Sequence, residues 1–597
     1  MKTNSIPERK NVPAKDKWDL TSLYMSDSDW ESDLSLIPVL ADELCNFKGK
    51  LASSAETMRD ALDTYCQLLM VMETSGNYAF LLVSADAGDS SNQEKYSRYM
   101  MTCSQADAKT SFFIPELQSI PDDEMKKRME RPDYADYKIW LSKKARMKPY
   151  ILSEKEERIM ALQSEAGETS KHTYETFTDV DLNFGKVKTP DGMKPLTQTT
   201  WSSFMHNPDR EIRRKAYKKY YGTFDANKNT LASLYAGSVN QDVFLSRARG
   251  YDSVRQMRLF PDKVDESVYD NLVNTVRANL EPLHKYYSIM KKLLKVDELR
   301  HYDVYVPLIP EVNKITPYED AVEIIRNALA PLGKEYTDTL CHGLLSGWVD
   351  RYENKGKHSG AFSSGTFVGE PFILVNYKED VIRDVFTLAH EGGHSMHSWY
   401  SKRSNVFMSY DYTIFEAEVA STFNEQLVFE YLMKTAKDEK LKKYLIATRA
   451  GDILATLYRQ TMFAEFEHQA HVLVEQGKPL SADVLRAEYR KLLEAYFGPE
   501  MHFEKTSDLE GLRIPHFYRA YYVYKYATGI SASLALAKRV TEGGEKEKAD
   551  YFKFLCSGGS RYPIEALKVA GVDMSTTAPV QAACDTFADL VRQMEAF

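Results

Sequence analysis

The segment TLAHEGGHSMHS, residues 387–398, contains three histidines and two adjacent glycines. Apolar residues recur at helical spacing before it, so we predict a largely buried helix over about residues 381–400. Residues four apart project from one face of a helix, so His390 and His394 can direct two imidazole nitrogens at one point. Buried imidazoles need polar partners, and a metal ion is one. The glycines each cost a helix about 1 kcal/mol relative to alanine, which close approach of a substrate or a neighbouring backbone would offset.

The pattern His-Glu-x-x-His at residues 390–394 predicts zinc chemistry. Zinc suits imidazole and carboxylate ligands, and a catalytic zinc keeps three protein ligands plus an open position for water. The glutamate of the pattern, Glu391, would take a proton from the attacking water and later pass it to the leaving amine. Chance supplies about 0.02 such matches in a chain of this length. The alternative reading is two surface histidines on a helix.

A third metal ligand has to come from elsewhere in the chain. His397 lies about one turn further along the helix, too far to close a tetrahedral site with both other histidines. We expect it to line the cleft or to hydrogen-bond to a ligand. A second acidic helix, YTIFEAEVASTFNEQLVFEYL at residues 412–432, offers Glu416, Glu418 and Glu425. Glu418 follows His394 by 24 residues, enough for a helix–loop–helix return. The alternative for these glutamates is a solvated helix face.

The composition is that of a soluble folded protein, with 43% hydrophobic and 27% charged residues. A net charge of -9 and the lack of a Lys/Arg cluster argue against a nucleic-acid partner. The six cysteines form no Cys-x-x-Cys pair, which indicates buried thiols in a reducing compartment. We find no secretory signal and no run of about 18 apolar residues. We therefore expect a cytoplasmic protein that does not bind membranes; its oligomeric state is left open.

The helical periodicity of the sequence is interrupted at two places. Residues 177–200, FTDVDLNFGKVKTPDGMKPLTQTT, predict a small hairpin around a Pro-Asp-Gly turn, and we place a boundary there between a helical N-terminal region, 1–200, and a catalytic region, 201–597. Residues 359–377, SGAFSSGTFVGEPFILVNY, predict two short strands around a Gly-Glu-Pro turn. An extended strand beside a catalytic helix can pair with a substrate backbone. The alternative is a purely structural hairpin.

Several segments together resemble one family, the oligoendopeptidase F branch of the thimet oligopeptidase metallopeptidases. They are KWDLTSLY (17–24), SGAFSSGTF (359–367), HEGGH (390–394), FEAEVASTFNE (415–425), PHFYRAYYVYKYATG (515–529) and GGSRYPIEALKVAGVDM (558–574). The resemblance spans nearly the whole chain. It implies a mainly α, two-lobed, thimet oligopeptidase-like zincin fold that encloses a deep channel, with a small β hairpin or sheet beside the active-site helix. It also implies that Glu418, not Glu416, is the third zinc ligand and that Glu425 orients a histidine.

The resemblance assigns roles to an aromatic segment as well. Tyr521 and Tyr524 would share a helix face, with Thr528 below them and His516 upstream. Taken alone, these tyrosines would be ordinary packing residues. The resemblance implies that His516, Tyr521 and Tyr524 hydrogen-bond the substrate and the oxyanion, where each donor contributes about 3 kcal/mol.

The sequence thus predicts a zinc metalloendopeptidase that hydrolyses internal bonds of short, unstructured oligopeptides. One Zn²⁺ per chain would be held by His390, His394 and Glu418, with Glu391 as general base and then general acid. The residues expected to pair with the substrate backbone are Gly360, Ala361, Phe362 and Ser363. One alternative is a dipeptidyl carboxypeptidase of related fold, which needs a cationic group for a free C-terminus. Another is an inactive helical peptide-binding protein, which has no chemical need for Glu391.

Overall fold

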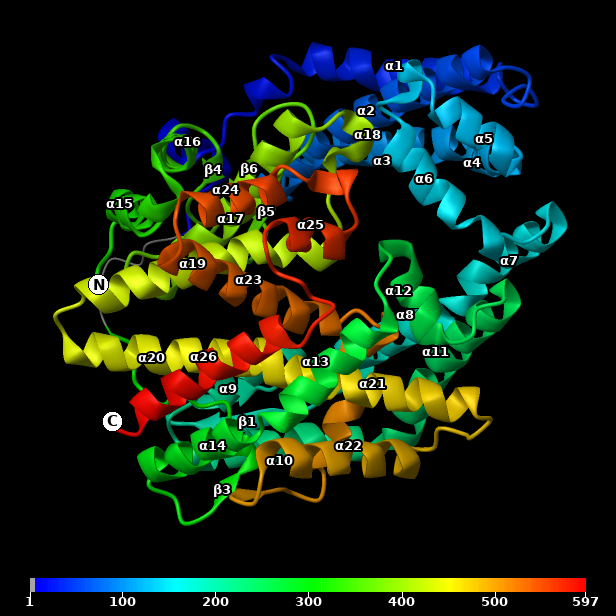
Figure 1. The fold of residues 1–597 in the computed structure, drawn as a ribbon. Coiled ribbons are helices and arrows are strands. Elements are labelled where there is room, and N and C mark those ends of the chain that lie inside the picture. Colours follow the sequence, from blue (N-terminus) through cyan, green and yellow to red (C-terminus); the bar gives the residue numbers. More distant parts are fainter. Residues whose placement is uncertain (1–5, 313) are drawn as a thin grey trace. The chain divides into compact units, whose positions relative to one another are not determined.

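The computed structural model describes residues 6–312 and 314–597 (Figure 1). The fold is mainly helical, as the sequence predicts. The chain divides into two compact units, each assembled from three segments. The first unit comprises Met1–Pro149, Val312–Thr435 and Ser533–Val572, and the second comprises Tyr150–Glu311, Ala436–Ala532 and Asp573–Phe597. The hairpin near residue 200 lies inside the second unit.

The first unit begins with a helical array whose starts are fixed by side-chain caps. The hydroxyls of Ser26 and Ser54 accept hydrogen bonds from the backbone N–H groups of Asp29 and Thr57 at the first turns of α1 and α2. The helices of this unit are α1 (Asp27–Cys45), α2 (Ala55–Ala85), α3 (Ser90–Thr110), α4 (Phe113–Ser119), α5 (Asp122–Met129), α6 (Lys138–Arg146), α15 (Tyr318–Ala328), α16 (Lys334–Leu345), α17 (Arg383–Ser404), α18 (Phe407–Tyr410), α19 (Ile414–Thr435), α24 (Glu545–Leu555) and α25 (Pro563–Val569). Residues of α23 (Tyr524–Glu542) from Ser533 onward also count with this unit.

Helix α2 is long and apolar enough, by length and composition alone, to cross a membrane. The expectation that no run of about 18 apolar residues is present did not anticipate this helix. More than half of the apolar stretch, 56%, is buried inside the fold. Trp30 of α1 donates its indole N–H to the carbonyl of Ser75 at 3.0 Å, and Leu62 and Leu81 of α2 are fully buried. The apolar side chains of α2 therefore form part of the core of the first unit.

A three-stranded sheet precedes α17. Strands β5 (Phe362–Ser364) and β6 (Phe372–Leu374) pair antiparallel, which confirms the predicted hairpin, and β4 (Val349–Asp350) adds to β6 in parallel. The strand order is β4-β6-β5, so β5 is an edge strand. The buried Lys357 ammonium lies 2.8 Å from Asp350 of β4 and donates to the carbonyl of Val375, just after β6, at 2.6 Å. These bonds tie the loop before β5 to the two other strands.

The second unit is also helical. Its helices are α7 (Glu154–Gly167), α8 (Thr169–Thr176), α9 (Gln198–Met205), α10 (Arg210–Ala226), α11 (Lys228–Arg249), α12 (Val254–Leu259), α13 (Glu266–Ala278), α14 (Glu281–Leu294), α20 (Glu439–Ile453), α21 (Arg459–Glu475), α22 (Ala482–Phe497) and α26 (Ala578–Met594). The predicted hairpin is confirmed as β1 (Lys186–Thr189) and β2 (Gly192–Pro195), and β3 (Leu299–Arg300) pairs in parallel with β7 (Met501–His502). Gly192, with φ 107°, permits the tight turn of the hairpin.

Two further features of the fold are a buried charge in the second unit and the free thiols of both units. The carboxylate of Glu510 is fully buried and accepts from Tyr489 at 2.8 Å and from Arg513 at 3.1 Å, while Arg459 also bonds to it. All six cysteines are free thiols. Three of them are buried, namely Cys103, Cys341 and Cys584, and the other three are half-buried.

Candidate metal centre

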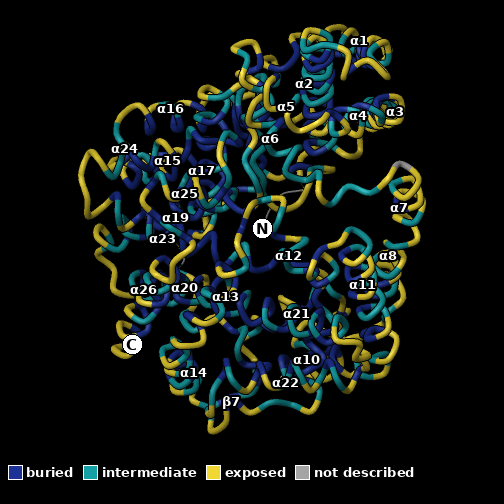
Figure 2. Tube along the Cα trace, turned by 45° about the vertical axis from the view of Figure 1, so that its right-hand side comes forward, coloured by how far each residue is buried: buried dark blue, intermediate teal, exposed yellow. Residues whose placement is uncertain are grey.

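Helices α17 and α19 pack with their backbones in contact. A Cβ atom built on Gly393 would lie 2.5 Å from the carbonyl oxygen of Ala420 and 2.6 Å from Cα of Ser421. The Asn424 amide of α19 donates to the carbonyl of Ala389 at 3.1 Å. The neighbouring backbone therefore explains the glycine at 393. Figure 2 shows the two helices as largely buried, in agreement with the prediction of a buried helix.

The close packing brings the three predicted metal ligands together. The Nε2 atoms of His390 and His394 lie 3.4 Å and 3.6 Å from Oε2 of Glu418. One ligand atom from each residue falls within 4.8 Å of the others. Zinc–ligand bonds of about 2.0–2.1 Å in a tetrahedron separate ligand atoms by about 3.3–3.4 Å. The residues present thus fit a single Zn²⁺-sized ion in chemistry and in spacing.

One side of this group is open. The side chains of His390, His394 and Glu418 are 23%, 18% and 38% exposed. A fourth ligand position can therefore be reached from outside the helix pair, which a catalytic metal requires and a structural one does not.

Two further side chains, those of Glu425 and Ser421, hold the predicted ligands in place. Nδ1 of His390 is hydrogen-bonded to Oε1 of Glu425 at 2.7 Å, the carboxylate that the resemblance assigned to this role. The hydroxyl of Ser421 donates to Oε2 of Glu418 at 3.1 Å. Carboxylates behind a ligating histidine fix its ring orientation and raise its basicity.

Burial and neighbouring charges shift the pKa values of these groups in different directions. Burial alone would lower the pKa of His390, but its bonds to Glu418 and Glu425 raise it to about 10. Burial, followed by the neighbouring His390, lowers the pKa of His394 to about 4. Burial would raise the pKa of Glu418, but the two imidazoles lower it to about 2. The carboxylates of Glu418 and Glu425 thus favour positive charge at His390.

Glu391 is placed beside the ligands but not among them. Its side chain is only 6% exposed, and burial raises its pKa to about 7, with His390 opposing and the other glutamates adding to the shift. Ser395 lies one turn further along the same face of α17, and its hydroxyl is 2.8 Å from that of Ser363 in β5. The predicted peptide-pairing strand therefore runs along the face of α17 that presents Glu391.

The expectation for His397 was wrong. Its side chain is fully buried, and its ring stacks on Tyr412 at 3.7 Å and contacts Phe554 at 4.9 Å. Neither ring nitrogen has a hydrogen-bond partner within residues 6–312 and 314–597. Burial accordingly lowers its pKa to about 3. His397 is a packing residue, because Tyr412 and Phe554 cover its ring.

The second unit contains the three residues predicted to act on the oxyanion. His516 is exposed in the short turn Pro515–Tyr518, whereas Tyr521 and Tyr524 are 2% and 0% exposed. Helix α23 begins only at Tyr524, so the predicted shared helix face is wrong. Tyr521 lies before the helix with φ 56°, and its hydroxyl is 2.9 Å from Nδ1 of His468. The catalytic role of these residues stays a prediction.

Two phenols that the sequence analysis overlooked lie nearer to His516. The rings of Tyr522 and Tyr526 are 6.3 Å and 6.2 Å from its imidazole, and their hydroxyls are 3.5 Å apart. Both are half-buried. Their i, i+4 spacing is a signal in the sequence, but the density of tyrosines in this segment conceals it.

Taken together, a mainly helical fold and two imidazoles meeting a carboxylate across a helix pair indicate the class of protein, an enzyme with a candidate metal-binding centre. The comparisons with known proteins agree. The model of peptidase family M3 matches residues 203–586, and an oligopeptidase F model matches residues 116–184. The chain belongs to peptidase family M3 and is a peptidase of oligopeptides.

Individual relatives are similar over the full length. An oligoendopeptidase F homolog of Borreliella burgdorferi is 38% identical, with 97% of this chain and 98% of the relative covered. Oligopeptidase PepF of Bacillus subtilis is 39% identical over 100% of this chain and 89% of the relative. The crystal structure of oligoendopeptidase-F from Enterococcus faecium superposes with a TM-score of 0.75 at 29% identity, covering 96% of this chain and 99% of that chain. The resemblance to the oligoendopeptidase F branch is confirmed.

Proposed function

We propose that this peptidase is a zinc endopeptidase that cleaves internal bonds of short, unstructured oligopeptides. The observation that carries the proposal is the spacing of His390, His394 and Glu418, which matches a tetrahedral zinc site with one open side. When bound, Zn²⁺ supplies a Lewis acid that polarises the scissile carbonyl and makes water a stronger nucleophile near neutral pH.

The chain's own residues perform the remaining steps. Glu425 orients the His390 ring from behind through a 2.7 Å bond. The Glu391 carboxylate accepts a proton from the attacking water and donates it to the nitrogen of the leaving amine as the peptide bond breaks. Its burial keeps bulk water away from the proton it holds.

Substrate pairing is proposed for β5. Within the residues that the structure describes, β5 pairs only with β6, so its outer edge can accept a peptide backbone. Backbone pairing is independent of side-chain identity, which supports broad sequence tolerance. The substrate-binding residues are those predicted from the sequence, Gly360, Ala361, Phe362 and Ser363.

The roles of His516, Tyr521 and Tyr524 rest on the resemblance. We propose that they donate hydrogen bonds to the substrate and to the oxyanion, with the exposed His516 as the first to test. His516→Ala should lower kcat by about 100-fold, as the loss of one oxyanion donor does, and leave metal content unchanged. Unchanged kcat in this variant would remove His516 from the mechanism.

The decisive experiment combines metal analysis with cleavage of an internally quenched oligopeptide. Wild type should hold about one zinc per chain and cleave between internal residues, and Glu391→Gln should retain zinc and lose nearly all activity. Glu418→Gln should lose zinc. Glu416→Gln is the matched control, because Glu416 lies on the same helix but bonds to Thr413 instead.

The outcome separates the proposal from its alternatives. Cleavage that always removes two residues from a free C-terminus, and never acts on the amidated peptide, would favour a dipeptidyl carboxypeptidase. If the wild type binds peptide but neither binds zinc nor cleaves the peptide, the chain is a peptide-binding protein.

A further inference from the structure

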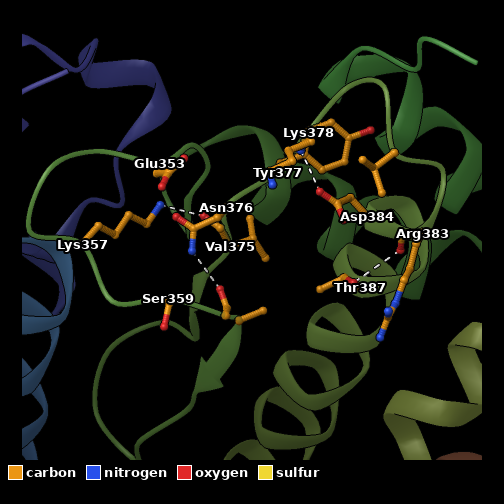
Figure 3. A pocket seen from close by; sticks show the side chains of 13 residues that line it. Glu353, Lys357, Ser359, Val375, Asn376, Tyr377, Lys378, Arg383, Asp384 and Thr387 are labelled. Carbon is orange, nitrogen blue, oxygen red and sulfur yellow. Dashed lines mark hydrogen bonds between the residues drawn. The ribbon is translucent and has the colours of Figure 1, made fainter. Parts of the chain in front are cut away.

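A pocket of about 580 Å³ lies beside the first turn of α17 in the first unit (Figure 3). Its lining comes from the loop that leads into β5, from the segment after β6 and from the start of α17. Gly360 and Ala361, two of the residues proposed to pair with a peptide, belong to this lining. The pocket is therefore continuous with the proposed peptide-pairing strand.

The pocket walls are held by hydrogen bonds within the chain. The Asn376 amide donates to the carbonyl of Gly360 at 2.9 Å. This bond links the segment after β6 to the segment before β5. The backbone N–H of Lys378 donates to the Asp384 carboxylate at 2.7 Å. The pocket is thus formed before any ligand arrives, which lowers the entropy lost on binding.

Two cations on the rim have no ion-pair partner among the residues that the structure describes. Lys378 and Arg383 are exposed, and neither side chain forms an ion pair within the part of the chain that the structure describes. The two acids of the lining are engaged differently. Asp384 accepts the Lys378 backbone N–H, and Glu353 lies on the far side of the pocket, near the Lys357 ammonium (Figure 3).

The position of Arg383 is unfavourable for stability. It is the first residue of α17, where the helix dipole is positive and a cation costs about 0.3–1 kcal/mol. Asp384 is the acidic residue of the same turn, and its carboxylate accepts the Lys378 backbone N–H. A negatively charged group from outside would benefit from the guanidinium and from the helix dipole together.

The distance from the metal centre fixes where on a substrate such a group would be. Arg383 precedes His390 by seven residues on the same side of α17, which is about 10 Å along the helix. An extended peptide covers that length in about three residues.

The direction of the substrate follows from the strand. β5 passes Ser395 at Ser363, and the residues before it reach the pocket shared with Thr387, so β5 runs in the same sense as α17. A peptide pairing with it antiparallel, the more stable arrangement, runs the opposite way. Its C-terminal part then lies over the pocket.

We propose that Arg383, assisted by Lys378, forms a subsite for a carboxylate about three residues beyond the cleaved bond, on the C-terminal side. The inference rests on the proposed endopeptidase function and adds a substrate preference to it. The carboxylate belongs either to an Asp or Glu side chain or to the free C-terminus of a peptide that ends there.

The test uses internally quenched peptides identical except at the third residue after the scissile bond, which is Asp, Asn or Lys, with cleavage sites read by mass spectrometry. Wild type should prefer Asp over Asn by about five-fold in kcat/KM, the effect of a partly exposed ion pair. Arg383→Gln should abolish the preference while still cleaving the Asn peptide, and Arg383→Glu should reverse it in favour of Lys. A second pair of peptides ends at the third residue as free acid or amide and separates the two carboxylate sources.

Two controls keep the subsite separable from the underlying function. Arg403→Gln removes a cation from the last turn of α17, where it stacks on Trp399, and should leave the preference intact. Affinity of the Asp and Asn peptides for Glu391→Gln, measured by fluorescence anisotropy, should show the same five-fold ratio without turnover and should shrink with added salt.

Specific results would overturn the proposal. Equal cleavage of the Asp and Asn peptides by wild type, or an Asp preference that persists in Arg383→Gln, excludes this subsite. An acid preference on the N-terminal side of the bond refutes the antiparallel direction. If no peptide of any charge is cleaved, the endopeptidase function itself has failed.

Discussion

A single methyl group at Gly393 should disable the metal centre. The added Cβ would lie 2.5 Å from the Ala420 carbonyl oxygen and 2.6 Å from Cα of Ser421, whereas ordinary contact begins at 3.4 Å. Both obstacles are backbone atoms, which cannot rotate away. Helices α17 and α19 would therefore have to separate by about 0.9 Å, the difference between 3.4 and 2.5 Å.

The consequences for stability and for metal affinity differ in size. Overpacking of this kind destabilises by about 1–3 kcal/mol, and alanine recovers about 1 kcal/mol of helix propensity relative to glycine, so the net change in unfolding free energy is about 0–2 kcal/mol. Metal–ligand distances tolerate about 0.2 Å. A shift of Glu418 by several times that amount relative to His390 should weaken zinc binding by more than about ten-fold.

The assay is zinc affinity by competition with a chromophoric chelator, together with thermal unfolding of the metal-free protein. Gly392→Ala is the matched control, because the nearest neighbours of its Cβ would be side-chain atoms of Leu340, with Cδ1 at 3.1 Å, and this side-chain end can rotate. Gly393→Ala should bind zinc much more weakly than Gly392→Ala. Equal zinc affinities for the two variants would refute the argument that backbone contact sets the ligand geometry.

Three further predictions follow from other contacts. Glu425→Gln removes the charged partner of His390 and should weaken zinc affinity by about 10–100-fold in the same chelator assay; unchanged affinity would contradict the orienting role. Glu510→Gln should destabilise the second unit at pH 7: burial would raise the Glu510 pKa, but Arg459 and its neighbours lower it to about 2. Because this pKa lies below the ordinary value of 4.5, the ionised carboxylate makes its full contribution to the free energy of unfolding above about pH 5. That contribution, about 3 kcal/mol, is lost progressively as the pH falls toward 2. Urea unfolding of wild type should show this acid dependence and the variant should lack most of it. His397→Phe should leave both zinc content and melting temperature nearly unchanged, because the ring makes no hydrogen bond in the described fold; loss of zinc would make His397 a ligand after all.

The parts of the fold that the sequence predicted correctly depend on local spacing. The i, i+4 histidines and the i, i+7 glutamates place their side chains on single helix faces wherever α17 and α19 lie in the fold. The two hairpins follow from turn residues such as Gly192, whose positive φ few other residues adopt. The choice of Glu418 over Glu416 came from the resemblance, and the 24-residue return only made it possible.

The parts that sequence reasoning missed depend on contacts between distant segments. Strand β4 has two residues and forms because β6 supplies its partner, so no periodic pattern in the sequence predicts it. The start of α23 at Tyr524 follows from the left-handed conformation of Tyr521, which the hydroxyl bond to His468 helps to hold. Helical spacing in the sequence predicts neither β4 nor the start of α23. The burial of His397 likewise depends on Tyr412 and Phe554, which lie outside its own helix.

The arrangement of α17 suggests why an enzyme that pairs with a peptide backbone can still discriminate among peptides. Along one side of this helix lie Arg383, then the metal ligands, and next to them Ser395, which contacts β5. A helix is a rigid spacer of about 1.5 Å per residue, whereas a bound peptide is an extended one of about 3.4 Å per residue. The interval between Arg383 and His390 therefore translates into a fixed number of substrate residues. In the proposed mode of binding, backbone pairing does not distinguish most substrate side chains, and Arg383 recognises the charge of a single residue at a set distance from the cleaved bond.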